Sequence, residues 1–250
     1  IDSAHSSSLH SSDMIPARVE SASADSKAWY RPSTDKSPRM QSQTTSYGFH
    51  YAAIRTPIKN SSSHDYLRIT EFVAPYYSLI PPNTSYNVAS VIVPIDNETT
   101  AFHFIAWGGD SRPSTEEWRK FAHSQKGVDL NERWEPIRTL ENNFLQDRQA
   151  MKLGNFTGIP GIPNQDIAMW VSMGKIADRT QDMLGASDLA IVEFRRLMVD
   201  AARTVAGGGK AIGTEGNRIP QAVIKSVQGV FAKTVDWRTL VDSDSRQAAE

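Results

Sequence analysis

Four strand-like segments follow one another in the first half of the chain, with only short polar turns between them. Aromatic and β-branched residues dominate these segments, and the second alternates between two faces: Tyr66, Arg68, Thr70 and Phe72 fall on one side, and mainly Leu67, Ile69 and Val73 on the other. No helical pattern separates them, so neighbouring strands can pair only in antiparallel fashion. The sequence therefore predicts an antiparallel sheet from residues 47–55, 65–74, 85–95 and 100–107, with turns at 57–64 and 96–98.

Helical patterns dominate the second half. Ser114 precedes two glutamates, which is typical of a helix N-cap with acidic residues in the first turn. A second helix is expected to start at Asn164 or Gln165, and a longer one with Ser187 as N-cap runs to about residue 202, before Gly207-Gly208-Gly209. Glycine and proline make 155–163 a loop. Strands followed by helices predict an α+β fold, in which a sheet is flanked by helices.

The chain ends are less regular. A short helix near residues 1–12 is expected, followed by an irregular segment, and 219–241 reads as a loosely structured tail. The chain starts at Ile1, and we expect it to be a piece of a longer polypeptide.

Composition excludes several classes of function. The 250 residues carry 27 basic and 28 acidic side chains, a net charge of −1, which argues against a general nucleic-acid binder. No cysteine is present, so disulfides, thiolate zinc sites, a cysteine nucleophile and cysteine-ligated iron–sulfur clusters are ruled out. The longest uncharged stretch, 72–95, is interrupted by prolines, so no membrane span is predicted. The composition is compatible with the cytoplasm.

Two histidines and an aspartate stand out in the first ten residues. His5 and His10 are five residues apart, about 140° on a regular helix, so the spacing alone is a weak metal motif and also suits two surface or capping histidines. Asp2 lies three residues before His5 and could orient its ring. Together they form D-x-x-H-x-x-x-x-H.

This pattern resembles the catalytic domain of Rieske non-haem iron oxygenases. The longer segment IDSAHSSSLHSSDMIPAR is similar to the phthalate 4,5-dioxygenase group of ring-hydroxylating oxygenases. Further segments look like the same group over most of residues 1–205: TSYGFHYAAIRTPI, FVAPYYSLIPPN, NFTGIPGIPNQDIAMWVSMGKIADRT and LGASDLAIVEFRRLMVDAAR. The resemblance implies a helix-grip fold for residues 1–250, with the N-terminal Rieske domain and its [2Fe–2S] cluster outside this chain, in agreement with the lack of cysteine.

The resemblance also implies a metal site. His5, His10 and Asp166 match the family's two histidines and one carboxylate for mononuclear Fe(II). Asp166 could instead be a favourable acid at a helix N-terminus, and Asp178 and Asp182 are rival ligands. Asp2 matches the aspartate that links an iron ligand to the cluster of the neighbouring subunit, although it could simply cap a helix.

Two arginines match the positions that bind substrate carboxylates in phthalate-type members. Arg31 and Arg68 provide planar forks suited to carboxylates, and Ser6 could add a hydrogen bond. Arg68 could otherwise form a buried ion pair with Glu71 or Asp65, and Arg31 could lie in a surface loop. Three aromatic residues on the last strand are expected to wall a ring pocket or the core: Phe102, Phe104 and Trp107. The remaining histidines are expected to be structural or at the surface: His50, His64, His103 and His123.

The implied function is O2- and NAD(P)H-dependent cis-dihydroxylation of a phthalate-like aromatic carboxylate. The implied partners are a flavin/iron–sulfur reductase and the Rieske domain of the next subunit, in a homotrimer or stacked trimers. Three alternatives stay open: a related monooxygenase or demethylase acting on another aromatic carboxylate or a sulfonate, a non-enzymatic helix-grip ligand-binding module, and a zinc hydrolase, which would lack an evident general base.

Overall fold

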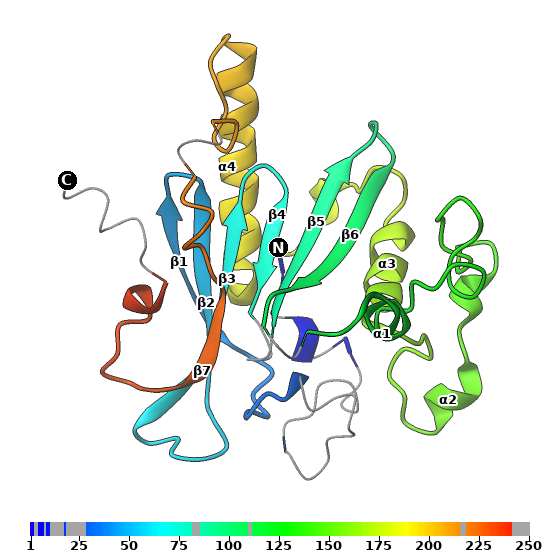
Figure 1. Ribbon diagram of the computed structural model, residues 1–250, viewed down its shortest axis with the longest axis horizontal. Helices are drawn as coiled ribbons and strands as arrows, with labels where there is room; N and C mark the ends of the chain where they lie inside the picture. The colour runs from blue at the N-terminus through cyan, green and yellow to red at the C-terminus, as the bar shows by residue number, and fades with distance from the viewer. Residues whose placement is uncertain are drawn as a thin grey trace.

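A seven-stranded antiparallel sheet forms the centre of the computed structural model, which describes residues 1–2, 5–7, 9–10, 18, 29–81, 86–109, 112–215 and 219–241. The path through the sheet is β1-β2-β3-β4-β5-β6, and β7 pairs with β3 beside β4 (Figure 1). The strands are β1 (Arg39–Thr45), β2 (Gly48–Arg55), β3 (His64–Val73), β4 (Tyr77–Ile80), β5 (Asn87–Pro94), β6 (Thr100–Trp107) and β7 (Val227–Ala232).

Helices lie around the sheet, so the predicted α+β class is confirmed. The α-helices are α1 (Thr115–Phe121), α2 (Arg148–Lys152), α3 (Ile162–Ser172) and α4 (Leu189–Ala206). Short 3₁₀ turns occur at η1 (His5–Ser7), η4 (Asn143–Leu145), η5 (Arg179–Gln181), η6 (Ala186–Asp188) and η8 (Trp237–Leu240). Within the described ranges, no helix is both long and apolar enough to cross a bilayer.

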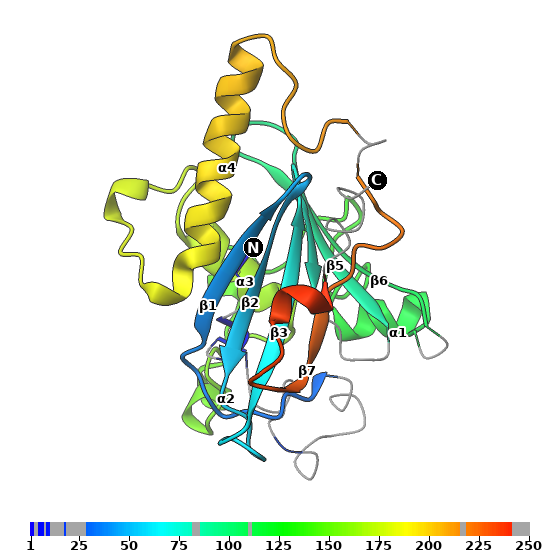
Figure 2. The same cartoon turned by 90° about the vertical axis from the view of Figure 1, so that its left-hand side faces the viewer.

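The two faces of the sheet have different tasks, because side chains alternate along each strand. One face packs Ala52, Ile54, Leu67 and Ile69 against Trp237 and Val241. On the other face, Phe49, Tyr51 and Phe72 pack beneath α4, which runs alongside β1 and β2 (Figure 2). Residues 66, 68, 70 and 72 share this second face, as their alternation predicted.

Three strands escaped prediction. β1 is polar, with the sequence RMQSQTT, and partly exposed, so it lacks an apolar alternation. β4 has only four residues. β7 lies in the segment expected to be a loose tail, and pairing with β3 supplies the order that its short, glycine-containing sequence does not indicate.

Two helix starts also differ from expectation. α3 begins at Ile162, two residues early, because a proline in the first turn needs no N–H partner. Ser187 is not the N-cap of α4: it lies in η6, and α4 follows Asp188. Ser114 does cap α1, with a full capping box to Glu117, and Gly207 ends α4 as predicted.

Gly161, the residue before α3, gives a test of how that helix is placed. Its φ is 84°, and a Cβ there would lie 2.5 Å from the His123 ring. We therefore expect Gly161→Ala to lower the free energy of unfolding by about 1–3 kcal/mol in urea denaturation. The control is Gly207→Ala, where φ is −83° and the nearest atom lies 3.6 Å away, with an expected change within about 0.5 kcal/mol. Equal losses in the two variants would contradict this account of Gly161.

Candidate metal centre and substrate pocket

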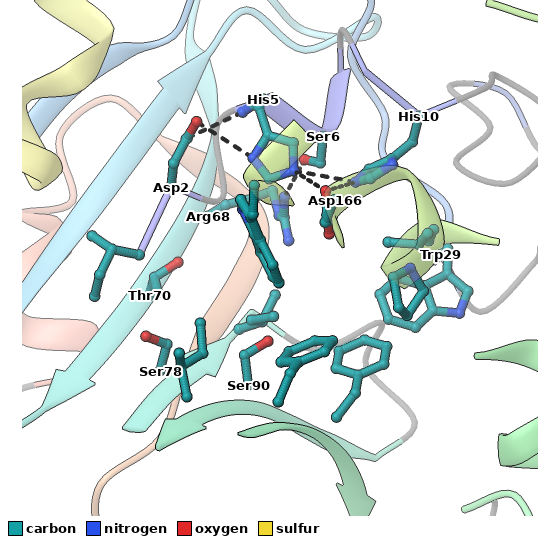
Figure 3. Close-up of a pocket in the computed structure, with 18 of the residues that line it drawn as sticks. Asp2, His5, Ser6, His10, Trp29, Arg68, Thr70, Ser78, Ser90 and Asp166 are labelled. Carbon is teal, nitrogen blue, oxygen red and sulfur yellow. Dashed lines mark hydrogen bonds and ion pairs between the residues drawn. The ribbon is translucent and has the colours of Figure 1, made fainter. Parts of the chain in front are cut away.

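His5, His10 and helix α3 meet at one side of the sheet. His5 lies in η1, His10 follows it, and Asp166 lies in the second turn of α3. One ligand atom from each of the three residues lies within 4.8 Å of the others, and the side chains point toward one another (Figure 3). The structure thus brings together the three residues that the sequence motif singled out.

The distances between these atoms suit binding of a single metal ion by all three residues. His5 Nε2 lies 3.2 Å from His10 Nε2 and 3.1 Å from Asp166 Oδ1, and His10 Nε2 lies 3.6 Å from the same oxygen. Two ligand atoms held at right angles, each about 2.1 Å from one ion, would be about 3.0 Å apart. Two imidazoles and one carboxylate on one side are also the donor set of non-haem Fe(II) sites with open positions.

Asp2 contacts the far side of His5. Its Oδ1 accepts from the His5 backbone N–H at 3.2 Å, and its Oδ2 lies 3.4 Å from His5 Nδ1. One carboxylate therefore contacts both the backbone and the ring of His5, which supports the orienting interpretation. The Asp2 side chain remains 38% exposed, the most accessible of this group.

Electrostatics separate the two histidines. Burial opposes protonation of His5, but hydrogen bonds to Asp166 and Asp2 outweigh it and raise its pKa to about 9. For His10, burial is the largest effect and lowers the pKa below its usual value. Without a metal, the cluster therefore favours a cationic His5 ring, protonated on both nitrogens, beside a neutral His10 ring.

Gln165 is a site residue that the sequence did not reveal. It is 1% exposed, and its Oε1 lies 2.7 Å from His10 Nδ1. Only its position beside Asp166, in a segment already tied to the metal site, could have drawn attention to it.

Two buried arginines lie close to the histidine–aspartate cluster. Arg31 and Arg68 both donate through Nη1 to Ser6 Oγ, which lies next to His5 in the chain; the Arg68 bond measures 3.3 Å. Burial, and then the charge of Arg68, lower the pKa of Arg31 well below its usual value, and burial also lowers that of Arg68. Arg31 is thus no surface loop residue.

The alternative prediction of an ion pair between Arg68 and Glu71 or Asp65 is wrong. Glu71 lies an odd number of residues away and so faces the other side of the sheet, 3.4 Å from His50. Asp65 also lies at an odd offset and pairs with Arg39 at 3.2 Å. Arg68 itself lines the pocket that the histidines reach.

Apolar and aromatic side chains complete this pocket. Phe102 and Phe104 line it, as expected for a ring pocket, whereas Trp107 does not, because its odd offset turns it to the other face of β6. Sequence reasoning missed several lining residues, among them Trp29, Ile80, Ile92 and Trp170. Nothing local distinguishes them from core residues.

The rival carboxylates lie elsewhere. Asp178 caps η5 by accepting from Thr180 N, and Asp182 pairs with Arg195 at 2.5 Å. His50 and His123 make structural contacts with Glu71 and Asp129 at 3.4 and 3.6 Å.

Comparison with known proteins identifies the group to which this site belongs. Residues 1–250 match the family described as LigXa C-terminal domain like. This chain belongs to that family. It is 60% identical over 239 residues to the phthalate 4,5-dioxygenase oxygenase subunit of Pseudomonas putida, covering 95% of this chain and 54% of that protein. It is 31% identical over 217 residues to the 3-chlorobenzoate-3,4-dioxygenase oxygenase subunit of Comamonas testosteroni, covering 81% and 50%.

The predicted membership among catalytic domains of Rieske oxygenases is thereby confirmed. This LigXa C-terminal domain-like chain spans about half the length of the two relatives. It has no cysteine, so it cannot itself supply the thiolates of a Rieske cluster.

The charge state of His5 predicts a pH dependence for the metal-free domain. Its pKa is about 9 when folded and about 6.5 when unfolded, so the native state binds the proton more tightly. The resulting contribution to the free energy of unfolding is fully present below about pH 6.5 and is lost as pH rises through about 9.

Urea denaturation in the presence of a chelator tests this. Over this pH range, the free energy of unfolding should fall less for His5→Gln than for wild type. His64→Gln, at the first residue of β3, where the His64 ring contacts the neighbouring Ser63 hydroxyl, is the control and should follow wild type. If the free energies of unfolding of wild type and His5→Gln changed in parallel with pH, the raised pKa of His5 would be contradicted.

Proposed function

We propose that residues 1–250 form the mononuclear-iron catalytic domain of an oxygenase component that cis-dihydroxylates a phthalate-like aromatic dicarboxylate. One ring, one O2, one NAD(P)H and one proton give a cis-dihydrodiol and NAD(P)⁺. One observation carries the proposal: the His5–His10–Asp166 cluster and two buried arginines line the same pocket. The 60% identity to a phthalate 4,5-dioxygenase oxygenase subunit supports it.

His5, His10 and Asp166 would hold the Fe(II), through Nε2, Nε2 and a carboxylate oxygen. Three protein ligands leave coordination positions open, and the metal, when bound, would supply the binding and reduction of O2. The chain's own task is to keep these three donors together on one side and to bring the ring beside them.

The arginines favour neighbouring carboxylates over distant ones. Arg31 and Arg68 both reach the single oxygen of Ser6, so their guanidinium groups lie close together. Two carboxylates on adjacent ring carbons can each meet one guanidinium, whereas carboxylates at opposite ends of a ring point apart. Binding a dianion would also relieve the repulsion between the two cations. An ortho-dicarboxylate therefore fits best.

Aromatic walls would hold the ring itself. Phe102, Phe104 and Trp170 line the pocket, and Phe102 meets Trp170 edge-to-face at 5.3 Å between ring centroids. Such surfaces bind an apolar ring and exclude water from it. The carboxylates fix its orientation at the arginine end.

Asp2 would connect the site to its electron donor. Its carboxylate contacts His5 and is partly accessible, as a bridge to the Rieske domain of a neighbouring subunit requires. The electrons would come from NAD(P)H through a flavin/iron–sulfur reductase, in a cytoplasmic homotrimer or stack of trimers.

Metal content tests the ligand set. The full-length protein that carries this chain should hold about one iron beyond the two of its cluster. The His5→Ala/His10→Ala variant and Asp166→Asn should lose that iron, because each removes at least one donor. Asp178→Asn, which alters an acid that only caps η5, should retain it. Zinc in its place would favour a hydrolase, and iron retained by the double variant would overturn the ligand set.

Calorimetry with phthalate tests the arginines. Arg31→Gln and Arg68→Gln should each weaken binding by about 1.5–3 kcal/mol, roughly 10–100-fold, because each loses a charge-assisted bond. Terephthalate should bind wild type more weakly than phthalate. The matched control is Arg39→Gln, at an exposed arginine paired with Asp65, which should bind phthalate normally. Unchanged binding in both pocket variants would contradict the carboxylate assignment.

A further inference from the structure

Gln165 forms a buried bridge between a loop carbonyl and a histidine of the metal cluster. Its Nε2 donates to the Ile159 carbonyl at 2.7 Å, and its Oε1 lies 2.7 Å from His10 Nδ1. Gln165 is 1% exposed and Ile159 is 4% exposed, so both contacts are made away from solvent. Polar groups buried to this extent need well-matched partners.

The Ile159 carbonyl determines which way the amide points. A carbonyl oxygen can only accept, so the NH2 end of Gln165 must face it. The amide oxygen is then the atom that faces His10, and it too can only accept. His10 must therefore donate from Nδ1, which leaves Nε2 with a free lone pair if the ring is neutral.

The free lone pair of His10 points toward the other members of the histidine–aspartate cluster, His5 and Asp166. Nε2 is the atom that lies 3.2 Å from His5 Nε2 and 3.6 Å from Asp166 Oδ1. Ligating histidines normally need a partner on the second nitrogen to fix tautomer and ring orientation. Here that partner is an amide whose direction is fixed by the main chain.

The loop carbonyl is itself held in place. Thr157 Oγ1 donates to the Ile159 oxygen at 3.2 Å and accepts from the Ile159 N–H at 3.1 Å. Thr157 is also buried. The sequence of contacts therefore runs from Thr157 through Ile159 and Gln165 to His10.

We propose that Gln165 is a positioning residue, which holds His10 in the Nδ1–H tautomer so that Nε2 is ready to bind a metal ion. The proposal deepens the proposed function, because it rests on the same metal site. It also explains why a glutamine suits this position better than an ionised glutamate: the amide accepts from His10 and donates to Ile159 at once, whereas a carboxylate can only accept.

Metal binding gives the first test. Titration of metal-free full-length protein with Co(II), followed by the visible spectrum of the bound ion, should give a Kd about 10–100-fold weaker for Gln165→Leu than for wild type. Gln165→Glu should also bind more weakly at pH 8, because an ionised carboxylate would face the Ile159 carbonyl without a proton between them. The matched control is Asn164→Leu: Asn164 is also buried on α3 and donates to the Pro160 carbonyl at 3.1 Å. Asn164→Leu should leave the Kd for Co(II) unchanged.

Nitrogen-15 NMR of ring-labelled histidine gives the second test and needs no metal. The His10 signals, identified by their loss in His10→Ala, should report the Nδ1–H tautomer in wild type and a mixture in Gln165→Leu. An Nε2–H tautomer in wild type, or a Gln165→Leu Kd equal to wild type, would overturn the proposal. If Gln165→Glu bound Co(II) as tightly as wild type, the role of the Ile159 carbonyl would be overturned. If wild type bound no metal while His10 kept the Nδ1–H tautomer, the proposed function would fail and the role of Gln165 in setting the tautomer would stand.

Discussion

The two-residue period of β3 determines which groups meet in the pocket. Even-numbered residues face the pocket and α4, so this single strand delivers Arg68 and Thr70 to the pocket. Odd-numbered residues face the opposite core, where Leu67 and Ile69 pack with Trp237. A shift of one residue in the pairing with β2 would put a guanidinium into an apolar core and a leucine into the pocket. The hydrophobic core thus holds the charged site in register.

Ser6 joins the two halves of the site. Its hydroxyl accepts from Arg31 and Arg68, while its chain neighbour His5 belongs to the metal cluster. The residue that contacts both arginines and the first histidine of the cluster are therefore joined by one peptide bond. Under the proposed function, a substrate bound by the arginines would lie beside the backbone that carries His5.

Sequence reasoning succeeded where a signal is local and repeated. The alternation of 65–74 and the capping residues of α1 predicted real elements and even the face on which Arg68 lies. It failed for β1 and β7, whose order comes from pairing with distant strands and not from their own composition. The metal candidates came from a motif resemblance, but Gln165, Trp29 and Trp170 escaped because their places depend on how distant segments pack.

The histidines and their carboxylate come from widely separated parts of the chain: His5 and Asp166 are 161 residues apart in sequence. An ion held by these residues, as proposed, would close a loop that contains β1 to β6, α1 and α2, and would act as a removable cross-link between the chain's first residues and α3. Binding to the folded form alone shifts the folding equilibrium by mass action. Under the proposed iron site, loss of the metal would therefore lower resistance to proteases as well as activity.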